Sequence, residues 1–311
     1  MTTEPVVIRP AQAASGDTPI GFAYGVGAFF LWGLMPLYLK VVEHIGPAEI
    51  VAHRAIWSVP IAGAVLLLLG RTADLKAAFR SPRTLAMAVV TAFLISINWG
   101  VYVWAITADR ALEAALGYYI NPLVNVLMGA VLLGERPNRL QMGAVGLAAL
   151  AVALLTVRQG SLPWISLVLA ISFGIYGFLR KTLPIGPSQG FFLEALVLSV
   201  PALGYVVWLA AEGGDHFLGG SPADPFLLML AGPVTAFPLL LYAFGAKLLR
   251  YTTIGLLQYI APTMIFLSAI FVFQEPFDAV KGIAFALIWT ALAIYSWSMV
   301  GESRRSVTTD L

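Results

Sequence analysis

Two ionisable side chains lie far inside apolar segments of the sequence. Arg54 stands in IVAHRAIWSVP and Glu194 in FFLEALVLSVP, each about 10 Å along a helix from the proline that opens its segment. A charge at the centre of a membrane helix costs about 2.5–3.5 kcal/mol on insertion scales, so it usually faces protein, a substrate or a water-filled cavity. We therefore expect both side chains to point into a helical bundle rather than toward lipid.

Each charge allows two interpretations. Arg54 is either a fixed positive charge for an anionic group or one partner of a structural pair with a carboxylate or with helix-end carbonyls. Glu194 is either a group that takes up and releases protons during transport or a neutral or paired structural residue. His53 and Trp57 flank Arg54. A histidine titrates near neutral pH when unperturbed, so His53 could relay protons, or it could be a hydrogen-bonded structural residue.

Amides and phenols inside apolar segments form a second set of candidates for substrate binding. Asn98 and Tyr102 are four residues apart, as are Asn121 and Asn125, so each pair shares a helix face. The complete set is Asn98, Tyr102, Tyr118, Asn121, Asn125, Gln258 and Tyr259. These groups could orient a substrate by hydrogen bonds, or they could hold helices together.

Two prolines stand in the interior of predicted membrane helices, Pro122 and Pro262. Each removes a backbone hydrogen bond and is expected to kink its helix. Paired breaks at equivalent positions of two repeats are typical of a transporter site or gate. We therefore assign both prolines a gating role.

The sequence offers no competing catalytic or cofactor chemistry. It has no cysteine, and it contains no HExxH or Walker A pattern. The three histidines, His44, His53 and His216, lack metal-ligand spacing. A net charge of +2 is too small to indicate nucleic-acid binding. We therefore predict no catalytic residue, no metal and no cofactor.

These residues would be positioned by membrane-spanning helices. Hydrophobic residues make up 59% of the chain and charged residues 11%, against roughly 25% charged in soluble domains. Ten apolar segments are each long enough to cross a hydrocarbon core of about 30 Å. We place them at 20–41, 48–69, 83–106, 111–133, 140–157, 162–180, 188–211, 225–247, 252–273 and 279–299.

Charge between the segments predicts the orientation. With ten spans, both termini share one side of the membrane, and that side holds thirteen Lys and Arg residues. The other side holds four, namely Lys40, Arg110, Arg158 and Lys281. This positive-inside bias predicts that both termini are cytoplasmic in a multi-pass protein of the cell (inner) membrane.

The chain also contains an internal duplication with an offset of 140 residues. LGYYINPLVNVLMGAVLLGE begins at residue 116 and LLQYIAPTMIFLSAIFVFQE at residue 256; Gly46-Pro47 likewise returns as Gly186-Pro187. Each copy holds five spans, and an odd number turns the second copy upside down in the membrane. We predict an all-α membrane protein of two inverted five-helix repeats, 19–158 and 159–300, between a disordered tail (1–18) and a second polar tail (301–311).

This architecture favours transport, because two similar halves of opposite orientation can exchange conformations and open one cavity to alternate sides. We expect a secondary active permease for a small metabolite or drug-like solute, embedded in the lipid bilayer, in which protons are a candidate coupling ion. The alternative is a non-transporting membrane sensor or a membrane-embedded enzyme. Short connections and the absence of a catalytic constellation disfavour this alternative.

Several motifs resemble a known family. FFLWGLMPLYLK, AHRAIWS, INWGVYVWAI, LEAALGYYINPLVN, GFLRK and LQYIAPT, spread over residues 21–299, are similar to the RarD-like permeases of the drug/metabolite transporter superfamily and its EamA domain. A Gly-Glu pair closes the fourth segment, whereas Gln274-Glu275 departs from it in the ninth. The resemblance implies a secondary permease for a drug or metabolite, and it carries over no catalytic residue.

Overall fold

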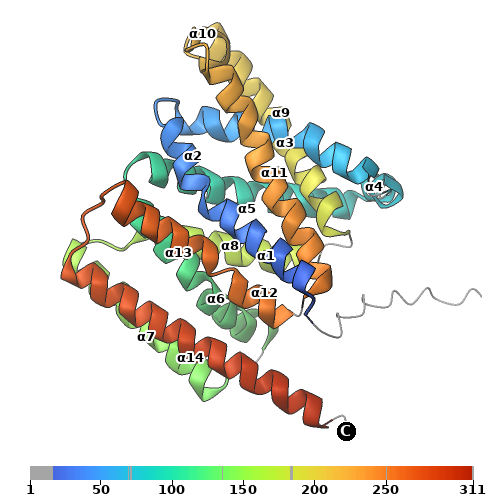
Figure 1. The fold of residues 1–311 in the computed structure, drawn as a ribbon. Helices are drawn as coiled ribbons and strands as arrows, with labels where there is room; N and C mark the ends of the chain where they lie inside the picture. Colours follow the sequence, from blue (N-terminus) through green and yellow to red (C-terminus); the bar gives the residue numbers. More distant parts are fainter. Residues whose placement is uncertain are drawn as a thin grey trace, which may run out of the picture.

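The computed structural model describes residues 17–68, 70, 72–134, 136–182, 185–249 and 251–309, and their regular elements are all helical (Figure 1). Residues 1–16 of the predicted N-terminal tail lie outside the described residues. The helices of the first half are α1 (Pro19–Gly33), α2 (Met35–Val41), α3 (Pro47–Leu68), α4 (Thr72–Phe79), α5 (Pro82–Thr107), α6 (Ala111–Leu133) and α7 (Arg139–Gln159). Those of the second half are α8 (Trp164–Thr182), α9 (Pro187–Ala211), α10 (His216–Gly219), α11 (Asp224–Leu248), α12 (Tyr251–Leu257), α13 (Ile260–Leu267), the π-helical segment η1 (Ser268–Val272) and α14 (Ala279–Thr309).

Nine segments of the described chain are long and apolar enough to cross a membrane, and they coincide with nine of the ten predicted spans. The predicted span 162–180 is the exception. Its apolar helical part, Trp164–Arg180, is shorter than the others, because the helix begins only after Pro163. The predicted C-terminal tail is a helical extension of α14 as far as Thr309.

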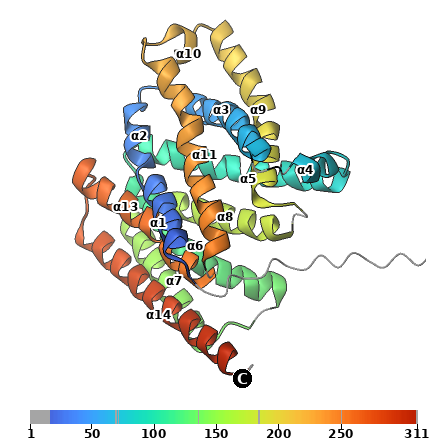
Figure 2. The same cartoon turned by 45° about the vertical axis from the view of Figure 1, so that its right-hand side comes forward.

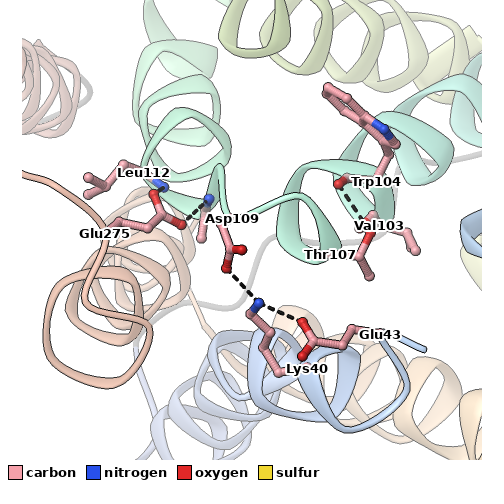
Figure 3. A network of polar contacts seen from close by, with 9 residues as sticks. Lys40, Glu43, Val103, Trp104, Thr107, Asp109, Leu112 and Glu275 are labelled. Carbon is pink, nitrogen blue, oxygen red and sulfur yellow. Dashed lines mark hydrogen bonds and ion pairs between the residues drawn. The ribbon is translucent and has the colours of Figure 1, made fainter. Parts of the chain in front are cut away.

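One end of the bundle gathers five connections that are distant in sequence. Lys40 at the end of α2 binds Glu43 and also Asp109, which precedes α6, at 2.6 Å each (Figure 3). Two further links at this end are Arg158 to Asp278, and His44 to Asp224. The connections that follow α2, α5, α7, α9 and η1 therefore lie at the same end of the bundle.

Glu275 makes the most buried link at this end. Its two carboxylate oxygens accept hydrogen bonds from the backbone N–H groups of Ala111 and Leu112, at 2.5 and 3.0 Å (Figure 3). These are free donors in the first turn of α6, which a side chain or water must satisfy. Burial raises the pKa of Glu275 above its usual range, against the lowering effect of the two N–H groups. The carboxylate therefore ties the second half of the chain to the first.

The opposite end holds both ends of the described membrane-spanning chain. The backbone N–H of Thr18 donates to the carbonyl of Leu248 at 3.2 Å, and Asn138 donates to Ser298 at 2.6 Å. A Cβ on Gly21 would lie 2.6 Å from that of Leu248. The start of α1 therefore packs closely on the end of α11 only because residue 21 is glycine.

Helix packing follows the 140-residue offset. α7 lies side by side with α14 in both views (Figure 1, Figure 2). Asn138 contacts Ser298, and Asp278 contacts Arg158. By the 140-residue offset, Asn138 corresponds to Asp278, and Arg158 corresponds to Ser298. Exchanging the two halves therefore turns one contact into the other. Because residue n of α7 meets residue 436 − n of α14, these equivalent helices run antiparallel.

The fourth and ninth predicted spans differ in regularity. α6 continues through Pro122 as one helix, whereas the ninth span is divided into α12, α13 and η1. The division falls at Gln258 and Tyr259, where Pro262 leaves the carbonyl of Gln258 without its helical donor. Gly134 and Gln274 both have positive φ, 66° and 54°, so the two spans end in the same left-handed turn despite the glutamine. The ninth span is thus divided close to Pro262, and the kinks and the gating role of Pro122 and Pro262 stay predictions.

Glu275→Ala is predicted to destabilise the protein, because two backbone N–H groups of α6 lose their acceptor. Each buried donor left unsatisfied costs about 1–3 kcal/mol. Thermal unfolding of the purified protein in detergent measures the effect. Asp109→Asn is the control, because it alters a neighbouring but exposed bond. Equal melting temperatures for the two variants would show that Glu275 does not hold the halves together.

Candidate functional site

Arg54 is buried between helices of both halves of the chain, with a relative exposure of 7%. Its Nε donates to Thr235 Oγ1 of α11 at 2.8 Å, and the ring of Trp99 from α5 lies 4.2 Å from the guanidinium carbon. Its Nη1 atom is buried and has no hydrogen-bond partner. The expectation that Arg54 points into the bundle agrees with this burial.

Tyrosines surround the guanidinium on the remaining sides. Tyr38, Tyr102 and Tyr118 are close enough to Arg54 to interact with it electrostatically. The rings of Tyr102 and Tyr118 make an edge-to-face contact with centroids 5.6 Å apart. The structure thus brings together three predicted residues from α3, α5 and α6, and it adds Trp99, Tyr38 and Thr235. We call these six residues the Arg54 site.

The predicted asparagines hold helices together around this site. Asn98 donates to the carbonyl of Leu169 and to Ser172, and it accepts from the Tyr118 hydroxyl at 3.1 Å. Asn121 donates to the carbonyl of Ala170 at 2.9 Å and accepts from Asn125 at 3.4 Å. Both Asn98 and Asn121 therefore bind α8, so the bonds of these asparagines match the helix-joining interpretation.

His53 and Trp57 face a different neighbourhood. Trp57 Nε1 donates to His53 Nδ1 at 3.2 Å, and the His53 ring stacks on Phe217 of α10 at 5.0 Å. His216, next to Phe217, binds Glu49 through its backbone N–H and its Nδ1, each at 2.7 Å. α10 is thereby fastened to α3, and all three histidines of the chain lie near this connection.

Trp57 also lines an apolar groove on the outside of the bundle. The groove has a volume of about 270 Å³ and lies between α3 and α11. Its lining residues are Trp57, Pro60, Ile61, Phe226, Met229, Leu230 and Pro233. A Cβ on Gly232 would lie 2.5 Å from the Trp57 carbonyl oxygen. The two helices therefore approach closely beside the groove.

Glu194 is buried and paired. It accepts a hydrogen bond from the Tyr176 hydroxyl at 3.0 Å and forms an ion pair with Arg180 at 3.3 Å, both from α8. A Cβ on Gly190, one helical turn before Glu194, would collide with the Arg180 guanidinium. The guanidinium thus reaches Glu194 only because residue 190 has no side chain. Of the two interpretations of Glu194, the structure matches the paired one in this conformation.

Arg54 and Glu194 hold equivalent positions in the two repeats but do not meet. α3 and α9 pack against each other antiparallel, since Gly63 lies against Phe192 while Ala55 clusters with Ala202. At this register the two charged residues are offset by about eight positions, or about 12 Å along the helices. Each charge therefore has its own environment.

Gln258 and Tyr259 lie apart from the Arg54 site, at the break between α12 and α13. Tyr259 packs against the main apolar core, as do Tyr118 and Tyr119 of α6 and α14 residues such as Tyr295. Tyr119 binds Thr263 at 2.6 Å and so joins α6 to α13. Gln258 and Tyr259 therefore lie at the interruption of the ninth span, and a role in substrate binding stays a prediction.

Five contributors to the charged sites were not predicted as such from sequence: Thr235, Trp99, Tyr38, Arg180 and Tyr176. Thr235 lies in an apolar segment and resembles any membrane threonine. Arg180 ends the predicted span 162–180, and the other three are among many aromatic residues of the apolar segments. No group of three or more His, Cys, Asp or Glu residues in the described chain could hold a metal ion.

Comparisons with known proteins identify relatives along nearly the whole chain. Residues 19–157 match the model of the EamA-like transporter family. A Streptomyces exfoliatus protein named Protein RarD is 41% identical over 293 residues, covering 94% of this chain and 93% of the relative. Protein RarD of Escherichia coli (strain K12) is 37% identical over 291 residues, covering 93% and 98%.

Two further comparisons concern a named transporter and a solved structure. A Bacillus subtilis (strain 168) protein named Uncharacterized transporter YojE is 41% identical over 300 residues, covering 93% of this chain and 98% of the relative. A solved crystal structure superposes with a TM-score of 0.59 at 19% identity, covering 88% of this chain and 96% of that chain. The latter likeness shows the fold alone.

Gly190→Ala is predicted to push Arg180 away from Glu194 and to leave a buried carboxylate without its cation. We expect a loss of about 1–3 kcal/mol, the cost of an unsatisfied buried polar group. Thermal unfolding measures it against Gly204→Ala, which lies on the same helix and meets open space. If the two variants unfold at the same temperature, the ion pair does not stabilise this part of the bundle.

Proposed function

This chain belongs to the EamA-like transporter family, and we propose that it moves a small metabolite or drug-like solute through the inner membrane by alternating access. That it is a multi-pass membrane transporter related to the RarD proteins follows from the family and its relatives. The solute class and the mechanism are the proposal. The rival functions are a membrane sensor and a membrane-embedded enzyme.

The proposed mechanism rests on two inverted repeats, 19–158 and 159–300. The exchange-related contacts of α7 with α14 support this arrangement. Equivalent helices that run antiparallel are what a two-fold axis in the membrane plane produces. The distribution of Lys and Arg residues supports cytoplasmic termini. In alternating access, the two repeats have different conformations in each state of the transporter. The continuous α6 and the divided ninth span are such a difference.

The observation that carries the proposal is the placement of Arg54. The Arg54 site is built from α2, α3, α5 and α6 of the first half and α11 of the second. A solute bound there would contact both halves, so a relative movement of the halves would change its access. Transporter sites near the membrane midplane at the interface between repeats follow this pattern.

Arg54→Gln is predicted to abolish export while leaving membrane insertion normal. Cells that express the protein are compared with cells that express the variant, by untargeted mass spectrometry of medium and cell extracts. We expect at least one solute to move from cells to medium with the wild type only. Membrane levels of both proteins serve as the control. Identical solute profiles for the two strains would favour a sensor or an enzyme over a permease.

Proton coupling through Glu194 is a finer part of the proposal. The buried carboxylate lies beside Arg180 and Tyr176, and a rearrangement that withdrew Arg180 would favour its protonation. Glu194→Gln should then remove the pH dependence of solute flux in proteoliposomes, because an amide does not titrate. Tyr176→Phe, which keeps the carboxylate, should retain that dependence. Wild-type pH dependence in Glu194→Gln would leave Glu194 a structural residue.

A further inference from the structure

The charge balance at Arg54 differs from that of the other cations linked to the bundle. Carboxylates pair with each of four others: Lys40 with Glu43 and Asp109, Arg110 with Glu113, Arg158 with Asp278, and Arg180 with Glu194. Those four are exposed or half-buried. Arg54, in contrast to these four cations, is buried. No carboxylate of the described chain forms an ion pair with it.

The groups that do surround Arg54 leave its charge uncompensated. Thr235 supplies one neutral hydrogen bond, and its hydroxyl also donates to the carbonyl of Ala231. Trp99 covers one face of the guanidinium, and Nη1 has no acceptor. An arginine does not lose its proton in proteins, so the positive charge is present at every working pH. A buried charge of this kind needs an anion from elsewhere.

The equivalent position in the other repeat shows what a satisfied charge looks like in this protein. Glu194 is also buried, and it has both a cation and a hydroxyl donor, Arg180 and Tyr176. The fold can therefore supply a counter-charge at this depth. The difference is that Glu194 has a counter-charge within the fold, whereas Arg54 has none among the described residues.

We propose that the Arg54 site takes an organic monoanion, a solute with one carboxylate on a flat or apolar body; this rests on the transport function proposed above. A guanidinium presents its N–H donors in a planar fork that matches a carboxylate. One cation balances one negative charge, so a monoanion fits it better than a neutral or cationic solute.

The remaining walls fit the uncharged part of such a solute. The Tyr38 hydroxyl donates to the carbonyl of Leu227 at 2.9 Å, and the Tyr118 hydroxyl donates to Asn98 at 3.1 Å. With these hydroxyls engaged, the two tyrosines offer ring faces and edges, as Trp99 does. Aromatic walls of this kind pack well against planar or apolar groups.

The first test compares the unliganded stability of two variants. Arg54→Met removes an unmatched charge and nearly preserves volume, so the melting temperature should stay equal or rise by about 2 °C or more. Arg180→Met leaves the buried Glu194 carboxylate without its cation, so it should lower the melting temperature. A fall in Arg54→Met as large as in Arg180→Met would overturn the proposal, because Arg54 would then be a structural partner.

The second test uses probes that share one body and differ in charge. Thermal shift of the purified protein is measured with 3-phenylpropanoate, its neutral amide and 3-phenylpropylamine, and with hexanoate and hexanamide. We expect at least one carboxylate to stabilise the wild type while the amides and the amine do not, and Arg54→Gln to lose the shift. Arg110→Gln, a cation elsewhere in the bundle, should keep it.

Equal shifts with acid and amide, no shift with either carboxylate, or a full shift in Arg54→Gln would each contradict a monoanion site. Both tests measure binding or stability alone, so they separate this inference from the transport function. Carboxylate binding without any exported solute would leave the site assignment standing and the permease proposal refuted. If export depends on Arg54 but no carboxylate changes the melting temperature, the permease proposal stands and the monoanion site is refuted.

Discussion

A buried guanidinium inside an apolar bundle is the constraint on which this account depends. The hydrocarbon of a membrane offers no water to stabilise an unpaired charge, so such a group persists only with a partner or a function. Thr235 and Trp99 fix the position of Arg54 without neutralising it. Four helices and the short α2 segment converge on the charge, and the two halves of the chain meet there. The two halves therefore meet at a buried charge that the described residues of neither half neutralise.

The packing of α7 against α14 is the second feature of the bundle that joins the two halves of the chain. α7 and α14 form an antiparallel pair at one side of the bundle, where exchange-related contacts join them. Their small residues, such as Ala144 and Ala148 against Ala284 and Ala291, are buried, which allows close packing. This pair is suited to a fixed support. α6 is continuous, whereas the corresponding span of the second half is divided into α12, α13 and η1.

Glu275 is a third direct contact between the halves of the chain. It satisfies two backbone donors of α6 from the opposite half of the chain. Equivalent backbone donors of the other half begin at residue 251, and the equivalent carboxylate is residue 135, which lies outside the described residues. The Glu275 carboxylate therefore joins the start of α6 to the segment after η1, at one end of the bundle.

Much of the fold could be predicted from sequence. Hydropathy predicts the membrane spans, loop charge predicts their orientation, and the 140-residue offset predicts which spans correspond in the two repeats. The burial of Arg54 and Glu194 followed from the cost of charge in lipid. The partners could not be predicted, since Arg180 and Thr235 reach the charges only through helix packing. Helix α8 overlaps the predicted span 162–180. The bonds that Asn98 and Asn121 make to its carbonyls could not be predicted, because they depend on helix packing.

The most direct test of the central claim is the current that a carboxylate evokes from the reconstituted protein on a solid-supported membrane. After a rapid jump in 3-phenylpropanoate or hexanoate concentration, the account predicts a transient current of the sign expected for an anion entering the protein. It predicts no current with the matching amides and none in Arg54→Gln. A current of equal size in Arg54→Gln, or one evoked equally by an amide, would contradict the claim that Arg54 binds a transported anion.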